Sequence, residues 1–391
     1  MALKRGISSA PLRGRRVLVR VDFNVPQDAN GQVADDRRIQ EALPTLNHLR
    51  AAGARAILMS HLGRPDGRRD PKYSLRPVVH RLSALLGQPV PLADDIVGVK
   101  ALELSARLEN GQFLMLENLR FHPGEESNDP AFASALARLG ELFVEDAFGT
   151  VHRAHASTVG VPHHLPSFAG LLVEREIREL SRLVEGPERP YVVLLGGAKV
   201  ADKLPLLTSF CGRADAVLIG GALAFPFLAA EGSRLGVSKV ESGLEAAVAE
   251  FRRVADAAET EIVLPQDLVV ERAGAVEVHA VGEVPPDGLA RDIGPVTRAR
   301  FAEVLGRSRT VFWNGPLGLA EDPRFADGTR EVLAGLGRVP GYHVAAGGDS
   351  ARVAQDLGVT GSFGFVSTGG GAALEFVQGL ELPGLAVLPD A

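Results

Sequence analysis

Short apolar runs alternate along this chain with longer stretches in which apolar residues recur every three or four positions. The run Val17–Val21 precedes such a stretch, which starts near Asp35 and ends at Gly53. A run of about five apolar residues is typical of a buried strand, whereas the wider spacing is typical of a helix with one buried face. Further strands are expected at 54–59, 89–92, 113–116 and 142–144, with helices at 75–86 and 130–139 and one ending before residue 111. This alternation predicts an α/β fold with a parallel sheet.

The same alternation resumes after a long segment of mixed character. Leu171–Val184 combines apolar and charged residues in a pattern that predicts a helix, which Gly186 and Pro187 end. Beyond it, strands are expected at 191–195, 216–219, 262–264, 310–313, 343–346 and 363–366, with helices between them and a small hairpin at 268–281. We therefore predict two domains, 1–170 and 186–378, joined by a helix at 171–185.

Composition places the chain among soluble globular proteins of a reducing compartment. With 391 residues, 46% of them hydrophobic, it can bury two ordinary cores, and its single cysteine, Cys211, allows no internal disulfide. We expect neither a membrane span nor a secretory signal, because the longest apolar stretch, from Ala216 to Ala230, contains two glycines and a proline. A cytoplasmic location follows as the prediction.

The net charge of −6 hides an asymmetry along the chain. Residues 1–85 hold sixteen Lys and Arg against seven Asp and Glu, so this part carries +9 and the remainder −15. A basic region confined to one part of an acidic protein favours a local anionic ligand over nucleic acid, which needs a broad basic face.

Polar side chains follow four of the expected strands in the first half. They are Asp22 and Asn24, His61 and Arg64, Arg120, and His152 and Arg153, with Arg38 in the first turn of a helix. Any one of them could be a solvated arginine or a structural histidine, but the fourfold repetition favours a shared site. Because the carboxyl ends of parallel strands meet at one edge, we expect a socket for a small, multiply anionic molecule. His152 and His155 lack a third ligand at a known spacing, so zinc is rejected.

Glycines take the same positions in the second half. Gly196 and Gly197 follow the strand 191–195, and Lys199 and Lys203 come next, four residues apart and expected on one helix face. Only six lysines stand against thirty-six arginines in the chain, so two lysines here indicate a need for compact ammonium groups. Other glycine-rich turns follow the strands 216–219, 310–313, 343–346 and 363–366. Such turns suit phosphate binding, and Asp349 is interpreted either as a helix cap or as a magnesium ligand beside a nucleotide.

The common nucleotide motifs are absent from the sequence. It contains no Gly-Lys dipeptide and hence no Walker A loop, no G-x-G-x-x-G after a strand, and none of the signature set of protein kinases. A dinucleotide oxidoreductase is therefore excluded.

Several long motifs in one order resemble the phosphoglycerate kinase family over nearly the whole chain. They include Val21-Asp22-Phe23-Asn24-Val25-Pro26, Ser60-His61-Leu62-Gly63-Arg64-Pro65, Leu116-Glu117-Asn118-Leu119-Arg120-Phe121, Asp146-Ala147-Phe148-Gly149-Thr150, Gly196 to Lys203, Trp313-Asn314-Gly315-Pro316 and Gly347-Gly348-Asp349-Ser350. The resemblance implies a glycolytic enzyme that reversibly transfers the acyl phosphate of 1,3-bisphosphoglycerate to ADP. It also implies a monomer with two Rossmann-like three-layer domains, with residues 379–391 returning to the first domain, and Mg²⁺ bound with the nucleotide.

By this resemblance, the two ligands have separate sets of residues. Phosphoglycerate would be held by Asp22, Asn24, Arg38, His61, Arg64, Arg120 and Arg153. The nucleotide would be held by Gly196, Gly197, Ala198, Lys199, Lys203, Gly220, Gly221, Asn314, Pro316, Gly318, Glu321, Gly347, Gly348, Asp349 and Ser350, with Asp349 toward the metal. Arg38, Lys199, Gly370 and Gly371 are assigned to catalysis.

The expected chemistry needs no general base, because the acceptor carboxylate is already ionised at pH 7. Arg38 would orient that carboxylate, Lys199 would accompany the phosphoryl group, and the amides of Gly370 and Gly371 would bind its oxygens. Transfer would require closure about the Leu171–Val184 helix.

Four positions depart from the family pattern: Ala222, Ala320, Ala346 and Glu145. The first two bear on contacts with the base and ribose. A catalytically silent nucleotide-binding protein on the same scaffold is the alternative, although such a protein would be expected to lose Arg38 or Lys199.

Overall fold

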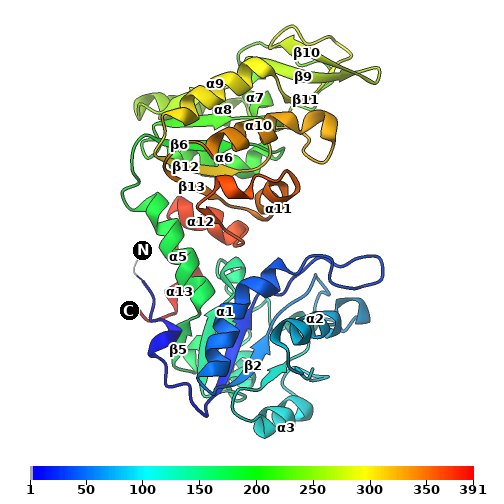
Figure 1. Cartoon of the computed structure of the whole chain (residues 1–391), viewed down its shortest axis with the longest axis vertical. Helices are drawn as coiled ribbons and strands as arrows, with labels where there is room; N and C mark the ends of the chain where they lie inside the picture. Colours follow the sequence, from blue (N-terminus) through cyan, green and yellow to red (C-terminus); the bar gives the residue numbers. More distant parts are fainter. Residues whose placement is uncertain (1–2) are drawn as a thin grey trace. The chain divides into compact units, whose positions relative to one another are not determined.

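The computed structural model describes residues 3–391, which form two compact units (Figure 1). The first unit comprises Met1–Ser181 with Leu380–Ala391, and the second comprises Arg182–Gly379. The division falls inside helix α5 (Leu171–Val184), the helix expected between two domains. No helix within residues 3–391 is both long enough and apolar enough to cross a bilayer.

The first unit is built on a five-stranded parallel sheet in the order β3-β2-β1-β4-β5. Its strands are β1 (Arg16–Val21), β2 (Arg55–Met59), β3 (Phe113–Met115), β4 (Leu142–Asp146) and β5 (Ser167–Ala169). The helices are α1 (Arg37–Ala51), α2 (Arg76–Leu86), α3 (Val99–Arg107) and α4 (Pro130–Ala137). The strand order reverses between β1 and β4, the point at which open α/β sheets bind ligands.

Two details of this unit differ from the sequence-based expectation. The strand expected at 89–92 is only a single bridge between Leu92 and Met115. Strand β5 was not expected, because its three residues carry too little pattern to predict a strand.

The second unit contains a six-stranded parallel sheet in the order β14-β13-β12-β6-β7-β8. Its strands are β6 (Tyr191–Leu195), β7 (Ala216–Ile219), β8 (Glu261–Val263), β12 (Thr310–Asn314), β13 (Tyr342–Ala345) and β14 (Phe365–Val366). The helices are α6 (Val200–Phe210), α7 (Phe225–Ala230), α8 (Glu245–Ala257), α9 (Pro295–Gly306), α10 (Asp327–Leu336), α11 (Gly348–Asp356) and α12 (Gly371–Gln378).

The expected hairpin belongs to a small antiparallel sheet of three strands. Strands β9 (Asp267–Arg272) and β10 (Ala275–Ala280) form the hairpin, and β11 (Leu289–Ile293) pairs with the other side of β9. The prediction of two Rossmann-like α/β arrangements with parallel sheets is confirmed.

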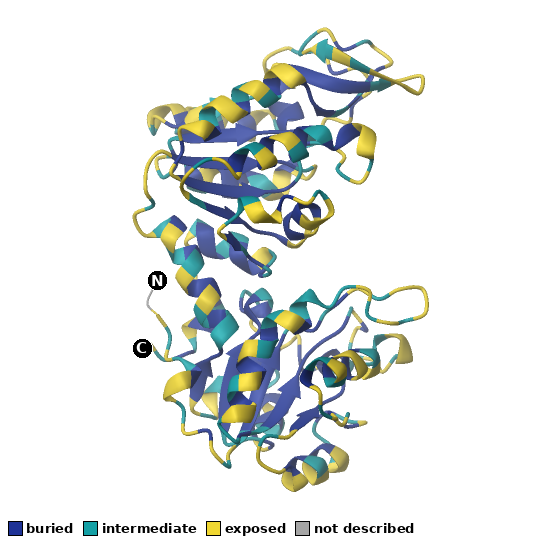
Figure 2. Cartoon of the chain, in the orientation of Figure 1, coloured by how far each residue is buried: buried dark blue, intermediate teal, exposed yellow. Residues whose placement is uncertain are grey.

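Each parallel sheet is buried on both faces. All five residues of β6 and of β12 are buried, and the strands of both parallel sheets are largely dark blue in Figure 2. Helices on both sides of a parallel sheet exclude water, which explains why these strands are continuous apolar runs instead of alternating patterns. Because both faces of each sheet are covered, the residues available to a ligand are those in the loops at the strand ends.

The last residues of the chain pair with its beginning. Helix α13 (Pro383–Ala386) is anchored by the Gly384 N–H, which donates to the Val151 carbonyl at 2.8 Å. The Arg5 N–H donates to the Pro389 carbonyl at 2.8 Å, and Lys4 forms an ion pair with Asp390. Both ends of the chain therefore contribute to the first unit.

Candidate active site

The polar residues expected to form an anion socket do follow the carboxyl ends of strands in the first unit. Asp22 and Asn24 come after β1, His61 and Arg64 after β2, and Arg120 after β3. Arg153 follows β4, and Arg38 lies in the first turn of α1, which begins at Arg37. Since β1, β2, β3 and β4 are neighbours in one parallel sheet, their ends meet at the same edge.

Hydrogen bonds connect these loops to one another. Arg38 Nη1 donates to the Asp22 carboxylate, and the Asn24 Oδ1 accepts from the Gly63 N–H at 2.9 Å. Arg120 Nη1 donates to the Gly63 carbonyl at 2.8 Å, so the turn after β2 is held from both sides. Arg64 follows that turn and is exposed.

Several arginines of this cluster act on its histidines. Burial lowers the pKa of His61 well below its usual value, and the nearby Arg20, Arg120, Arg153 and Arg38 lower it further. Burial and neighbouring arginines also lower the pKa of His155, to about 4. Neutral histidines among closely spaced arginines indicate a site that gains stability when an anion enters.

Arg20 is a member of this cluster that sequence reasoning missed as a site residue. It lies in β1 and is only 1% exposed, with Nη2 3.1 Å from His61 Nδ1. The sequence does contain a signal that could have predicted this role, because Arg20 is a charged residue inside the apolar run Val17–Val21. Arginine is rarely buried without a specific partner.

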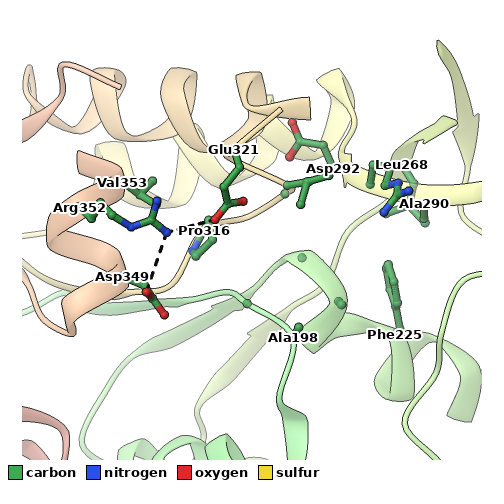
Figure 3. Close-up of a pocket in the computed structure, with 16 residues that line it drawn as sticks. Ala198, Phe225, Leu268, Ala290, Asp292, Pro316, Glu321, Asp349, Arg352 and Val353 are labelled. Carbon is green, nitrogen blue, oxygen red and sulfur yellow. Dashed lines mark hydrogen bonds and ion pairs between the residues drawn. The ribbon is translucent and has the colours of Figure 1, made fainter. Parts of the chain in front are cut away.

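The second unit contains a cavity of about 410 Å³ where its glycine-rich loops meet (Figure 3). Seven of the residues predicted for the nucleotide line it: Gly197, Ala198, Gly221, Pro316, Gly318, Glu321 and Asp349. The lining residues that were not predicted include Phe225, Leu268, Asp292 and Arg352. These residues lie within helices and strands. The sequence pattern of such elements predicts which residues are buried, but it does not indicate which residues contact a ligand.

Four of the predicted residues that do not line the cavity connect the loops beside it: Gly196, Asn314, Gly347 and Ser350. Asn314 Nδ2 donates to the Ala346 carbonyl at 2.7 Å, and the Ser350 Oγ accepts from the Gly315 N–H at 2.8 Å. A Cβ on Gly196 would clash with the Pro316 carbonyl, and a Cβ on Gly347, where φ is +102°, would clash with Asn314. The loops after β6, β12 and β13 can therefore approach each other only because they contain glycine.

The two lysines of the central motif do not share a helix face, which corrects the expectation from their spacing. Lys203 lies within α6, and its ammonium donates to the Gly196 carbonyl. Burial lowers the pKa of Lys203 to about 8, against the opposing effect of Asp349. Lys199 instead occupies the N-cap position, with extended backbone and an exposed side chain. The helix α6 begins only at the next residue, Val200, whose N–H donates to Glu241 Oε2.

Gly370 and Gly371 lie at the start of α12. Gly370 is the N-cap with φ +56° and ψ −125°, and Gly371 is the first residue of the helix. The positive φ turns the backbone so that the loop after β14 leads into the N-terminus of α12. The unpaired N–H groups of a helix N-terminus favour an anion.

Acidic side chains near the cavity are few. Asp349 lies in the first turn of α11 with its side chain 88% exposed, and Arg352 contacts Glu321 at 3.2 Å and Asp349 at 4.0 Å (Figure 3). Residues 3–391 contain no cluster of three or more metal-ligating side chains. The accessible carboxylate of Asp349 fits Mg²⁺, which usually takes one or two protein carboxylates and completes its shell with phosphate oxygens and water.

Comparison with known proteins identifies the chain's relatives. The family model for phosphoglycerate kinase matches residues 7–380. The chain belongs to the phosphoglycerate kinase family. The phosphoglycerate kinase of Coprothermobacter proteolyticus is 49% identical over 387 residues, which cover 98% of this chain and 98% of the relative. That of Rubrobacter xylanophilus is 47% identical over 391 residues, with coverage of 99% and 98%.

Solved structures of phosphoglycerate kinases share the fold. The enzyme from Coxiella burnetii matches with a TM-score of 0.89 at 36% identity, and the enzyme from Pyrococcus horikoshii OT3 with 0.87 at 32%. Each match covers 98% of both chains. The predicted family and activity are confirmed: the chain is a phosphotransferase with a carboxyl acceptor, acting between phosphoglycerate and adenine nucleotides in glycolysis. The silent-scaffold alternative is not favoured.

Proposed function

We propose that the cationic cluster of the first unit binds the phosphoglycerate and that the cavity of the second unit binds the nucleotide with Mg²⁺. The observation that carries this assignment is the group of closely spaced arginines around the neutral His61. Arginine binds carboxylate and phosphate oxygens bidentately, and phosphoglycerate supplies both kinds of group. Asp22, Asn24, Arg38, His61, Arg64, Arg120 and Arg153 are the residues assigned to it.

The nucleotide phosphates are assigned to the glycine-rich loops after β6, β12 and β13. Lys203 supports the phosphate end, since its ammonium already lies against Gly196 and is influenced by Asp349. Glu321 and the apolar lining around Phe225 face the rest of the nucleotide. Asp349 would hold Mg²⁺, which when bound neutralises phosphate charge.

Transfer rests on positioning and charge neutralisation by the chain's own residues. In the direction from ATP, a carboxylate oxygen of 3-phosphoglycerate forms a bond to the terminal phosphorus in line as the bond to the ADP oxygen breaks. Arg38 orients the carboxylate, Lys199 accompanies the transferring group, and the amides of Gly370 and Gly371 bind its equatorial oxygens. No proton changes hands, which agrees with the excess of cations over candidate bases.

Closure of the two units about α5 is part of the proposal, since the two ligands are assigned to different units and must meet. Closure also excludes water that would hydrolyse an acyl phosphate. We further expect the enzyme to act as a cytoplasmic monomer.

A coupled assay of ATP-dependent phosphorylation of 3-phosphoglycerate with Mg²⁺ tests the residue assignment. We expect Lys199→Ala and Arg38→Ala each to lower kcat by about 100-fold or more, the loss typical of removing a group that stabilises charge in the transition state. Arg37→Ala is the matched control: Arg37 is the neighbouring residue in the same turn but pairs with Asp35, so its kcat should stay within about threefold of wild type. Equal losses for Arg37 and Arg38 would contradict the assignment.

A further inference from the structure

The contact between Arg20 and His61 determines where the histidine carries its proton. Arg20 Nη2 lies 3.1 Å from His61 Nδ1, and both side chains are buried. A guanidinium has five N–H donors and no acceptor, so Nδ1 must accept this hydrogen bond and cannot carry a proton. In a neutral imidazole the proton then lies on Nε2.

Arg20 is itself held rigidly in this position. Its Nε donates to Ser157 Oγ at 2.9 Å, and Ser157 Oγ donates to Glu125 Oε1 at 2.6 Å. Arg20 Nη1 donates to the Val21 carbonyl. Each of the three guanidinium nitrogens therefore has a hydrogen-bond partner, and the group cannot turn away from His61 without losing several hydrogen bonds in a buried environment.

The free nitrogen of His61 is the one that would meet a ligand. No residue in the described part of the chain hydrogen-bonds to Nε2 of His61. The charged groups that act on the ring are Arg20, Arg120, Arg153 and Arg38, all cations. A second proton on the ring would have to displace the Arg20 contact and add positive charge beside four arginines.

We propose that Arg20 is a positioning residue that keeps His61 in its Nε2–H form, so that His61 presents one fixed N–H donor to the bound phosphoglycerate. This inference rests on the proposed assignment of His61 to that substrate. A donor that is set before binding costs no reorganisation when the anion enters.

Nitrogen NMR of the ligand-free enzyme labelled with ¹⁵N-histidine tests the tautomer directly. The His61 signals are assigned by their loss in His61→Ala. In wild type we expect Nε2 protonated, Nδ1 unprotonated, and a ring pKa well below the ordinary histidine value. In Arg20→Gln we expect a tautomer mixture, because glutamine can donate to Nδ1 or accept from it. The ring pKa should stay below its ordinary value, because burial and the other three arginines remain. A proton on Nδ1 in wild type would overturn the proposal, and this measurement requires no Arg20 variant to fold.

Kinetics test whether Arg20 acts through His61. We expect Arg20→Gln to raise the KM for 3-phosphoglycerate about tenfold, the effect of misplacing one good hydrogen bond, with kcat and the KM for ATP within about twofold. The increase in KM should accompany the tautomer mixture seen by NMR, which a merely structural loss would not produce. The double variant Arg20→Gln with His61→Ala should be no worse than His61→Ala alone, whereas additive effects would overturn the positioning role.

The same experiments separate this inference from the assignment beneath it. If His61→Ala leaves the KM for 3-phosphoglycerate unchanged, the substrate assignment of His61 fails although the NMR result stands. If His61→Ala raises that KM but Arg20→Gln leaves the tautomer unchanged, the assignment stands and the role of Arg20 is rejected.

Discussion

At the scale of one residue, Glu145 is a carboxyl that is fully buried although only one of its two oxygens has a hydrogen-bond partner. It lies near the end of β4 opposite Arg20 in β1 and is fully buried. Oε1 accepts from the Ala147 N–H at 2.9 Å, whereas Oε2 has no hydrogen-bond partner in the described structure. Burial therefore raises the pKa of Glu145 well above its usual value, although Arg20 opposes the effect. An ionised Glu145 destabilises the folded state.

We predict that Glu145→Gln stabilises the enzyme at pH 8 and has a diminishing effect toward acid. A carboxyl whose pKa is raised by folding contributes most to stability below its unfolded pKa, and that contribution is lost as the pH rises through the folded pKa. The melting temperature of the variant should exceed that of wild type by about 2–4 °C at pH 8, which corresponds to roughly 1 kcal/mol, and should match it near pH 4.5.

Glu141→Gln is the control with the opposite sign. Hydrogen bonds from the Arg16 N–H and the Arg15 side chain lower the pKa of Glu141, so its contribution is present at neutral pH and is lost in acid. Removing it should lower the melting temperature at pH 7 and lose effect below about pH 4. Parallel pH profiles for the two variants would contradict this interpretation.

At the scale of an element, helix α12 has a glycine at each terminus, and the two glycines have different roles. Gly370 precedes the helix at φ +56° and ψ −125°, and Gly379 ends it in the left-handed region at φ +82° and ψ +17°. A Cβ at either position would meet no atom within 4 Å, so a substitution acts through the backbone alone. Only the first glycine lies at the helix N-terminus, where N–H groups without intrahelical partners favour an anion.

We predict different consequences for alanine at these two ends. Gly370→Ala should lower kcat at least about tenfold, because that backbone conformation is nearly exclusive to glycine and its loss redirects the amides of Gly370 and Gly371. Gly379→Ala should cost about 1 kcal/mol of stability and leave kcat within about twofold. Assays and thermal melts of both variants check this pair, and an equal loss of kcat would contradict the catalytic role of Gly370.

At the scale of the whole molecule, the two proposed binding sites belong to separate compact units. Each unit has its own parallel sheet and its own buried core. The chain contributes to the first unit from both ends, which leaves α5 and the segment near Gly379 as the connections between the units.

We predict that small-angle scattering will detect compaction only in the ternary complex. The radius of gyration should fall when 3-phosphoglycerate and Mg-ADP are both present and should change little with either one, because a single ligand provides contacts to one unit only. Samples with each ligand alone are the internal controls. A radius that is the same in all four states would argue strongly against closure.

Much of this protein could be predicted from the local pattern of its sequence. Apolar runs and helical spacings are local properties, so they predicted both parallel sheets, the span of α5 and the hairpin of β9 and β10. The positions of Asp22, His61 and Arg120 could also be predicted as one edge, because parallel strands place their carboxyl ends together. Where the local pattern was weak, as in the three residues of β5, it failed.

Only the tertiary structure decided which of these residues act on one another. Arg20 and His61 lie 41 positions apart, and Arg352 reaches Glu321 across 31 positions. Hydrogen bonding across such separations, and the burial that raises the pKa of Glu145 and lowers those of His61 and Lys203, depend on the packing of whole elements. The sequence alone thus determined which chemical groups stand at the strand ends, and folding determined their protonation states and partners, because desolvation and long-range contacts exist only in the packed molecule.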